Sequence, residues 1–205
     1  MFLAGEEDQG QTGIPPTEDL MREHGVLIRI LLIYGAAKKY LIAETLCDLS
    51  FINHVILETA LIAEHFIEDY HQKLEEQYVF PAFLQEQKLV QLVHTLRDQH
   101  QAARELTRCI KYFAAIQNQP MDLADLLSSY IRMYEPHSAR EDTVIFPAFR
   151  QLVSPSRLEQ LGQKFEEIEE KLFGKNGFQR IVTQVSQIEQ ALGIYTLSQF
   201  TPSYT

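Results

Sequence analysis

Two stretches of this sequence carry the same residues at the same spacing, and these residue types bind metal ions in many proteins. The shared pattern is a histidine, a glutamate four positions later and, five positions after the glutamate, the letters F-P-A-F. It occurs at His71, Glu75 and 80–83, and again at His137, Glu141 and 146–149. Residues four positions apart share one face of an α-helix. Each copy therefore places an imidazole beside a carboxylate, a pair that suits a transition-metal ion.

Two further histidines precede the two copies, each next to a polar neighbour. His24 follows Glu23, and His100 follows Gln99. Apolar residues recur around them at three- and four-residue steps, so all these histidines and glutamates fall on the core-facing stripes of predicted helices. The predicted metal ligands are His24, His71, Glu75, His100, His137 and Glu141.

Burial of these six side chains requires compensation, because an unpaired buried charge costs several kcal/mol. Two divalent cations would provide it. Their positive charge is largely balanced by the two glutamates and a bridging hydroxide. The sequence therefore predicts a pocket for two metal ions, with Glu75 and Glu141 free to bridge from one ion to the other.

The elements that position these residues are helices, since the apolar periodicity is helical almost throughout and strand signals are almost absent. Four long helices are predicted over residues 17–46, 50–78, 88–116 and 121–145. Because the chain repeats one helix pair, we expect an all-α antiparallel four-helix bundle. Thr17 is the predicted N-cap of the first helix. Pro81 is predicted to break or bend the second helix, and the fourth is predicted to stop before Pro147.

The predicted bundle occupies residues 17–150 and lies between two segments outside the repeat. Residues 1–16 are rich in glycine and acidic residues and are predicted to be a disordered leader. Residues 151–205 are predicted to be a C-terminal helical extension with helices over about 154–174 and 178–192.

The composition narrows the class of partner and the cellular compartment. The chain has 205 residues, 18 Lys+Arg against 28 Asp+Glu and a formal net charge of −10, which argues against a nucleic-acid partner. No apolar run is long enough to cross a bilayer, so no membrane partner is expected. Cys47 and Cys109 form no disulfide framework or zinc motif. We expect a cytoplasmic protein, or a periplasmic one if an export signal has been removed.

The order of these residues also resembles a known family. His, then H-x-x-x-E, then His, then H-x-x-x-E, with F-P after each glutamate, is similar to the hemerythrin-like HHE cation-binding domain, and the resemblance covers about residues 17–150. It implies that the six predicted ligands hold a non-haem di-iron centre of two iron ions with an oxo or hydroxo bridge. Glu75 and Glu141 would be the bridging carboxylates. The implied partner is a small diatomic ligand or peroxide.

One position departs from the oxygen-carrying hemerythrins. Those proteins have a fifth histidine one turn after the histidine of the third helix, and this chain has Arg104 there. A near-symmetric site of four histidines and two glutamates favours binding, sensing or reaction with dioxygen, nitric oxide or peroxide over reversible oxygen carriage. Arg104 would either reach the pocket and pair with an anionic ligand or pair with a nearby carboxylate.

Two other functions remain alternatives at this point. The bundle could bind or store metal, including zinc, without redox chemistry, or it could be a helical interaction module without metal. The sequence leaves open whether the protein is an enzyme, and it does not give the oligomeric state.

Several weaker candidates accompany the main site. Glu64 and Glu68 are candidate acceptors for the ligand imidazoles, and Tyr130 is a candidate hydrogen-bonding group near the metals. The histidines predicted to lie at the surface or in helix packing are His54, His65 and His94.

Overall fold

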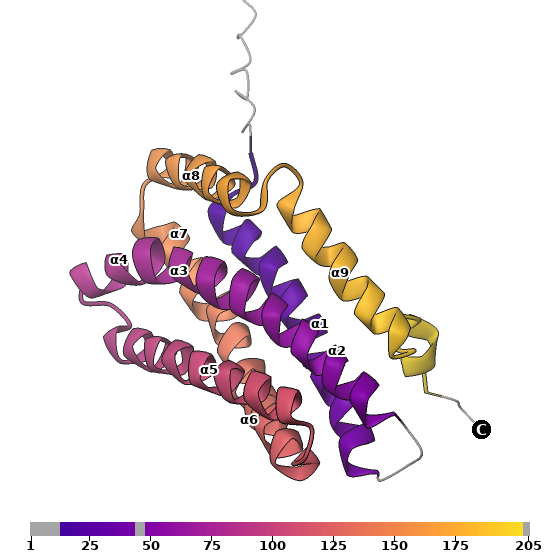
Figure 1. Ribbon diagram of the computed structural model, residues 1–205. Helices are drawn as coiled ribbons and strands as arrows, with labels where there is room; N and C mark the ends of the chain where they lie inside the picture. The colour runs from indigo at the N-terminus through magenta and orange to yellow at the C-terminus, as the bar shows by residue number, and fades with distance from the viewer. Residues whose placement is uncertain (1–12, 44–47, 203–205) are drawn as a thin grey trace, which may run out of the picture.

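The computed structural model describes residues 13–43 and 48–202, which form helices and no strand (Figure 1). The first long helix is α1 (Pro16–Ile42). The second segment is continuous and consists of α2 (Leu49–Ile62), η1 (Ala63–His71), α3 (Gln72–Leu74), η2 (Glu75–Val79) and α4 (Phe80–Gln85). The third helix is α5 (Val90–Ile116), and the fourth segment consists of α6 (Pro120–Arg140), η3 (Glu141–Ile145) and α7 (Phe146–Leu152). The elements η1, η2 and η3 are π-helical.

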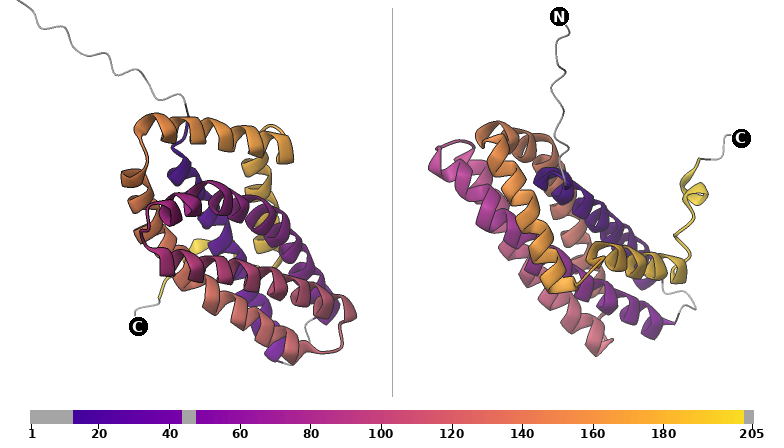
Figure 2. Two further views of the ribbon diagram at one scale, coloured as in Figure 1. Left: turned by 90° about the vertical axis from the view of Figure 1, so that its left-hand side faces the viewer. Right: turned by 90° about the horizontal axis from the view of Figure 1, so that it is seen from above.

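The four long segments form the predicted antiparallel bundle. α1 packs against α2 and α6, and α5 packs against the same two helices, so the segments enclose one core (Figures 1 and 2). Leu20, Ile30 and Tyr34 of α1 and Ile56 of α2 are fully buried there. Each such side chain contributes about 1.5–3 kcal/mol through the hydrophobic effect. The prediction of an all-α bundle is confirmed.

The beginning of α1 differs from the prediction. Thr17 is not an N-cap, because the helix starts at Pro16 and the cap position is Pro15, whose side chain makes no capping hydrogen bond. The Oγ1 of Thr17 instead accepts a hydrogen bond of 3.0 Å from Nη1 of Arg150, which ties α1 to α7. A proline in the first turn needs no partner for its missing N–H, so the helix can start there. The helix ends at Ile42, and the rest of its predicted end, residues 44–47 with Cys47, lies outside the described residues.

Pro81 does not break the second helix and Pro147 does not stop the fourth, so the helix ends predicted at residues 78 and 145 were wrong. Each proline is the second residue of a helix, α4 or α7, that directly follows a π-helical turn. In these turns the N–H of Phe80 donates to the carbonyl of Glu75, and the N–H of Phe146 donates to the carbonyl of Glu141. A proline ring in a regular α-helix clashes with the carbonyl four residues earlier. The wider turn changes that register, so both segments continue to Gln85 and Leu152.

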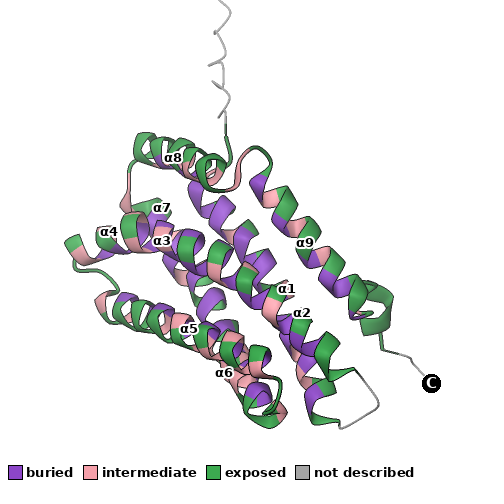
Figure 3. Ribbon diagram, viewed as in Figure 1, coloured by how far each residue is buried: buried purple, intermediate pink, exposed green. Residues whose placement is uncertain are grey.

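Two helices after the bundle cover its side. α8 (Pro155–Phe173) and α9 (Gly177–Ala191) both contact α1, and α9 also contacts α2 (Figure 2). Ser154 caps α8 by accepting a hydrogen bond from the N–H of Arg157. Because the bundle covers α1 on one side and these helices cover it on another, α1 carries many buried residues (Figure 3). The 3₁₀ turn η4 (Leu197–Phe200) follows. The predicted leader lies outside the described residues up to residue 12.

Within residues 13–43 and 48–202, none of the helices combines the length and the apolar character that a membrane crossing requires.

Candidate metal centre

The structure brings all six predicted ligands together in the core as two neighbouring clusters. In each cluster two imidazole nitrogens and one carboxylate oxygen lie within 4.8 Å of one another. One cluster contains His24, His71 and Glu75, and the other contains His100, His137 and Glu141. All six side chains are buried. We name the first group cluster A and the second cluster B.

Each glutamate lies between imidazoles of both clusters. Oε2 of Glu75 is 3.6 Å from Nε2 of His71 in its own cluster and 3.3 Å from Nε2 of His100 in cluster B. Oε2 of Glu141 is likewise 3.1 Å from Nε2 of His137 and 3.3 Å from Nε2 of His24. A carboxylate in this position can reach an ion in either cluster, which is the geometry that a bridging ligand needs.

The other ring nitrogen of each histidine meets an oxygen acceptor on a neighbouring helix. These Nδ1 contacts are His24 with Asp142 at 2.7 Å, His71 with Glu23 at 2.6 Å, His100 with Glu76 at 3.1 Å and His137 with Gln99 at 2.9 Å. An acceptor at Nδ1 holds the proton on that atom and leaves the Nε2 lone pair for the pocket. Metal-binding histidines usually have such a partner, which fixes the tautomer and the ring orientation.

The four acceptors follow the internal repeat. Glu23 and Gln99 each precede the histidine of their own helix and support the histidine of the next segment. Glu76 and Asp142 each follow the glutamate of their own segment. Glu76 contacts His100 of the third helix, and Asp142 contacts His24 of the first helix. The four contacts therefore connect the four segments in a closed ring. Sequence reasoning missed these acceptors, although every one is adjacent to a predicted ligand.

The centre of the pocket contains buried polar atoms that the described part of the chain leaves without a hydrogen-bond partner. They are both carboxylate oxygens of Glu75, both of Glu141, and Nε2 of His100. In addition, Nε2 of His24 and Nε2 of His71 lie only 3.1 Å apart. A cation bound among these atoms would satisfy the carboxylates and replace the contact between the two imidazoles, so the residues fit a metal centre.

The pKa shifts have the signs expected when two buried carboxylates and several imidazoles share a pocket. Burial and the neighbouring Glu141 charge raise the pKa of Glu75 well above its usual range. Burial has the same effect on Glu141, but His137 and His24 outweigh it and lower the pKa of Glu141. A cation bound between the two carboxylates would favour the ionised form of both.

The histidines divide by their surroundings. Burial lowers the pKa of His71 well below its usual range and that of His100 to about 4, so both imidazoles are neutral and able to bind a cation. Burial acts in the same direction on His24, but the hydrogen bond to Asp142 and the nearby carboxylate of Glu141 outweigh it and raise the pKa of His24 to about 9. The imidazole of His24 must lose its proton when a metal binds.

The repeated F-P motif supplies apolar walls to the pocket. The ring of Phe146 stacks on His24, and the ring of Phe80 lies against His100, each with its centroid 5.5 Å from the imidazole. Both phenylalanines are fully buried. Each ring contacts a histidine from the other helix pair, so the motif gives both clusters an apolar wall.

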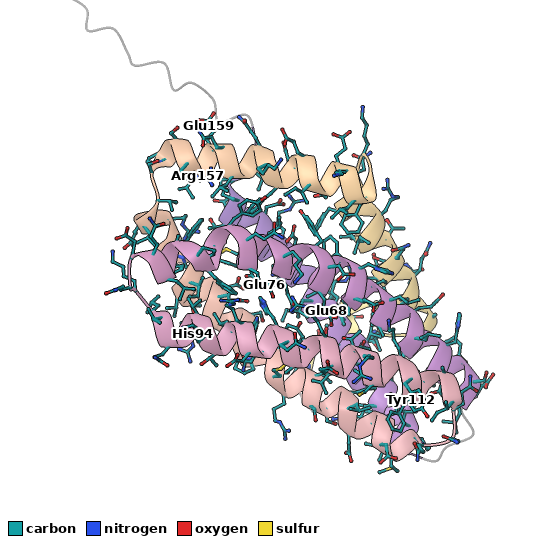
Figure 4. The ribbon with its side chains drawn as sticks, turned by 60° about the vertical axis from the view of Figure 1, so that its left-hand side comes forward. Glu68, Glu76, His94, Tyr112, Arg157 and Glu159 are labelled. Carbon is teal, nitrogen blue, oxygen red and sulfur yellow. The ribbon has the colours of Figure 1, made fainter. Side chains whose placement is uncertain are left out.

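Arg104 pairs with a carboxylate, one of the two roles considered for it. Its Nη2 is 2.6 Å from Oε1 of Glu76, and Nζ of Lys73 is 2.7 Å from Oε2 of the same residue. Burial raises the pKa of Glu76, but hydrogen bonds from His100, Lys73 and Arg104 outweigh it, and the pKa is lowered. Glu76 is therefore ionised while it supports His100. Figure 4 labels Glu76 on the second segment, next to α5.

The weaker sequence candidates divide between correct and wrong predictions. Glu64 and Glu68 are not acceptors for ligand imidazoles, because Glu64 pairs with Lys111 at 2.5 Å and Glu68 accepts a hydrogen bond from Thr107. Tyr130 is fully buried between Tyr34 and Tyr134, and its hydroxyl has no partner among the described residues. The histidines predicted to lie at the surface are exposed: His54, His65 and His94.

Comparison with a known domain family gives a match to most of the chain. The sequence model of the hemerythrin HHE cation binding domain matches residues 16–149, and a second match covers residues 91–176. The first match includes all six predicted ligands. The second begins within α5, the helix that carries His100.

Several curated proteins are similar to the chain over most of its length. Uncharacterized proteins from Mycobacterium bovis and from two strains of Mycobacterium tuberculosis are each 49% identical over 191 residues. The aligned region covers 91% of this chain and 73% of each relative. Comparison with solved structures gives no match.

Proposed function

This chain belongs to the hemerythrin HHE cation-binding domain family, and we propose that its pocket holds two iron ions that bind, sense or react with dioxygen, nitric oxide or peroxide. Metal binding is the general property that the family suggests. Iron as the native metal, two ions per chain and a diatomic or peroxide ligand are the specific parts of the proposal.

The observation that carries the proposal is the set of unpartnered atoms at the pocket centre. Both oxygens of Glu75 and Glu141 are buried without a hydrogen-bond partner in the described residues. At the same time, all four histidines direct Nε2 inward while Nδ1 meets an acceptor. A helical interaction module would have no reason to leave carboxylates unpaired in its core.

The residues of the chain would have separate roles around such a centre. His24 and His71 with Glu75 would hold one ion, and His100 and His137 with Glu141 would hold the other. When bound, iron supplies reversible electron transfer and coordination positions for a small ligand. The phenylalanine walls exclude bulk water, and the Nδ1 acceptors keep the imidazoles in one tautomer.

Iron analysis and absorption spectroscopy together test the proposal. Protein loaded anaerobically with ferrous salt should contain two iron ions per chain. It should develop near-ultraviolet absorption of bridged ferric iron when dioxygen or hydrogen peroxide is added. Tight zinc binding without any iron-dependent spectral change would support the alternative of non-redox metal binding or storage. Purified protein that binds no metal at all would support the interaction module.

Two matched variants test the ligand assignment. His71→Ala and His137→Ala should each lose bound iron, because each removes a predicted ligand. His54→Ala is the control, since His54 is exposed on α2 and pairs only with Glu58. Equal loss of iron in all three variants would contradict the assignment.

A further inference from the structure

An apolar groove lies away from the metal centre, between α2 and α9, which run side by side in Figure 1. Its volume is about 610 Å³. The apolar side chains that line it include Phe51, Val55, Ile62, Ile181, Ile188 and Ala191. Pockets of this volume accept drug-sized molecules, so the groove has room for several side chains of a partner. Continuous apolar surface of this kind marks an interaction site.

The polar residues along the groove favour an uncharged occupant. Among the described residues that line it, Glu58 is the one carboxylate, and it pairs with His54 at 3.3 Å. The lining contains no lysine or arginine from the described part of the chain. Gln184 and Gln187 are exposed along α9, and their amides can donate and accept hydrogen bonds. The groove therefore suits a peptide segment with apolar side chains and no charge.

The same chain carries such a segment after α9. Residues 193–202, which we name the arm, include the 3₁₀ turn η4. Leu197 is 81% exposed and Phe200 is 53% exposed, and no residue of η4 is buried. The sequence has no charged residue from 190 to 205. Covering these side chains would be favourable, because each square ångström of apolar surface removed from water contributes about 25 cal/mol.

The end of α9 directs the arm away from the groove of its own chain. Gly193 has a φ of +70°, and the N–H of Ile194 donates to the carbonyl of Glu189 at 2.9 Å, which is a left-handed helix cap. The hydrogen bond to Glu189 raises the pKa of Arg29, and the nearby Tyr195 raises it further, so the arm starts on the α1 side of α9. The right-hand view of Figure 2 shows the arm and α2 on opposite sides of α9. The arm could reach its own groove only by unwinding this cap.

We propose that the groove binds the arm of a second copy of this chain, and that two copies exchange their arms to form a closed dimer. Ten extended residues span about 33 Å. The part of the groove wall from Phe51 to His65 is about 21 Å long at the helical rise per residue. The arm is therefore long enough to follow the groove. Reciprocal exchange makes the same contact twice about a two-fold axis and leaves neither arm nor groove unpartnered.

The oligomeric state of the full chain tests this proposal. Sedimentation velocity should show a dimer at about 100 µM, since contacts of this kind have dissociation constants in the micromolar range or below. Leu197→Asp in the arm and Ala191→Arg in the groove should each weaken association at least about 30-fold, because each places a charge in an apolar contact. A wild type that stays monomeric at this concentration would overturn the proposal and leave the groove to its own arm or to a small apolar molecule.

Two matched variants control for the introduced charges. Leu172 is 55% exposed on α8, and Gln190 is exposed on α9 beside Ala191, but neither lies in the arm or lines the groove. Leu172→Asp and Gln190→Arg should therefore remain dimers. If they weakened association as much as Leu197→Asp and Ala191→Arg do, the proposed contact would be wrong. Because all four residues are exposed or partly exposed in the single chain, every variant should unfold like the wild type in dilute solution.

A mixture of Leu197→Asp with Ala191→Arg distinguishes arm exchange from a dimer formed through another face. The intact arm of Ala191→Arg fits the intact groove of Leu197→Asp, and the second contact brings the two introduced charges of opposite sign together. The mixture should therefore associate at a concentration where neither variant does so alone. A mixture that stays monomeric would overturn the proposal. The inference does not rest on the proposed function, and the metal content of every variant should equal that of the wild type.

Discussion

The protein buries carboxylates in two regions and satisfies them in different ways. Glu189 of α9 is 6% exposed, and both of its oxygens accept hydrogen bonds from Arg29 of α1, at 2.9 Å from Nε and 2.5 Å from Nη2. Glu75 and Glu141 are fully buried in the bundle, and none of their oxygens has a hydrogen-bond partner in the described structure. The chain therefore pairs one buried carboxylate with a guanidinium that hydrogen-bonds both of its oxygens. The two carboxylates of the pocket have imidazoles around them instead, an arrangement that a bound cation would complete.

Metal removal should have the largest effect and tests this comparison directly. An ion that binds only the folded state at a hundred times its dissociation constant stabilises that state by about 2.7 kcal/mol. Two ions should therefore raise the free energy of unfolding by about 5 kcal/mol. Denaturant melts of metal-free and ferrous-loaded protein measure the difference. The double variant His71→Ala/His137→Ala should show no such gain. An equal gain in that variant would show that the stabilisation does not come from ions bound at these ligands.

The second prediction concerns the apolar part of the extension interface. Phe165 of α8 is fully buried, and its ring centroid lies 5.6 Å from that of Tyr78. Phe165→Ala should lower the free energy of unfolding by about 4 kcal/mol, because it removes buried area and leaves a cavity. The metal content should remain that of the wild type. Phe200→Ala is the control, since Phe200 is 53% exposed and its loss should change stability by less than about 0.5 kcal/mol.

A third prediction concerns the pH dependence of stability that arises from Glu68, which is 3% exposed. Burial raises the pKa of Glu68 from 4.5 to about 7. The folded state then holds more protons than the unfolded state, so stability is full below about pH 4.5 and is lost as the pH rises through 7. The loss is about 3 kcal/mol.

Glu68→Gln should remove this loss, because the amide stays neutral and its oxygen can still accept the hydrogen bond from Thr107. Urea melts of the metal-free wild type and variant at pH 4.5, 6 and 8 give the free energy of unfolding at each pH. The slope of this free energy against pH should be smaller in the variant. Glu18→Gln, at an exposed position, should retain the wild-type slope. Parallel slopes for wild type and Glu68→Gln would show that Glu68 titrates normally.

The smallest effect is expected at the ion pair of the extension. Arg29→Met leaves Glu189 buried without its counterion and should cost about 2 kcal/mol, below the usual figure for a buried pair because the Arg29 side chain is 25% exposed. The double variant Arg29→Met/Glu189→Leu should recover most of that loss, since it replaces both charges with apolar groups. Chemical denaturation measures both variants. A double variant as unstable as Arg29→Met would show that the pair contributes more than charge compensation.

The predictable part of the site is the part encoded by spacing along one helix. His71 and Glu75, or His137 and Glu141, are four residues apart, and a repeated i, i+4 pattern can be found in a single sequence. The outer acceptors were missed because each hydrogen bond crosses between helices. The contact between His24 and Asp142 joins residues 118 positions apart. It depends on which helices are neighbours and on their relative rotation, and no local pattern contains that information.

The helix ends show a second limit of local reasoning. Proline is a reliable signal against a regular α-helix, so Pro81 and Pro147 indicated an end or a break. The structure instead places a π-helical turn ahead of each proline, starting at Glu75 and at Glu141. A π-helical turn has no strong sequence signature of its own, although it is frequent at functional sites. Here the recurrence of F-P at a fixed distance from both glutamates was the only signal in the sequence.

The ring of acceptors also sets a condition on the order of events during protein synthesis. His24, His71 and Glu75 leave the ribosome early, whereas Asp142 and the ligands His137 and Glu141 are translated near the end of the bundle. A nascent chain that stops before residue 137 contains cluster A without Asp142 and only one ligand of cluster B. Such a chain should bind metal poorly, so we expect metal binding to wait until nearly the whole bundle has been translated.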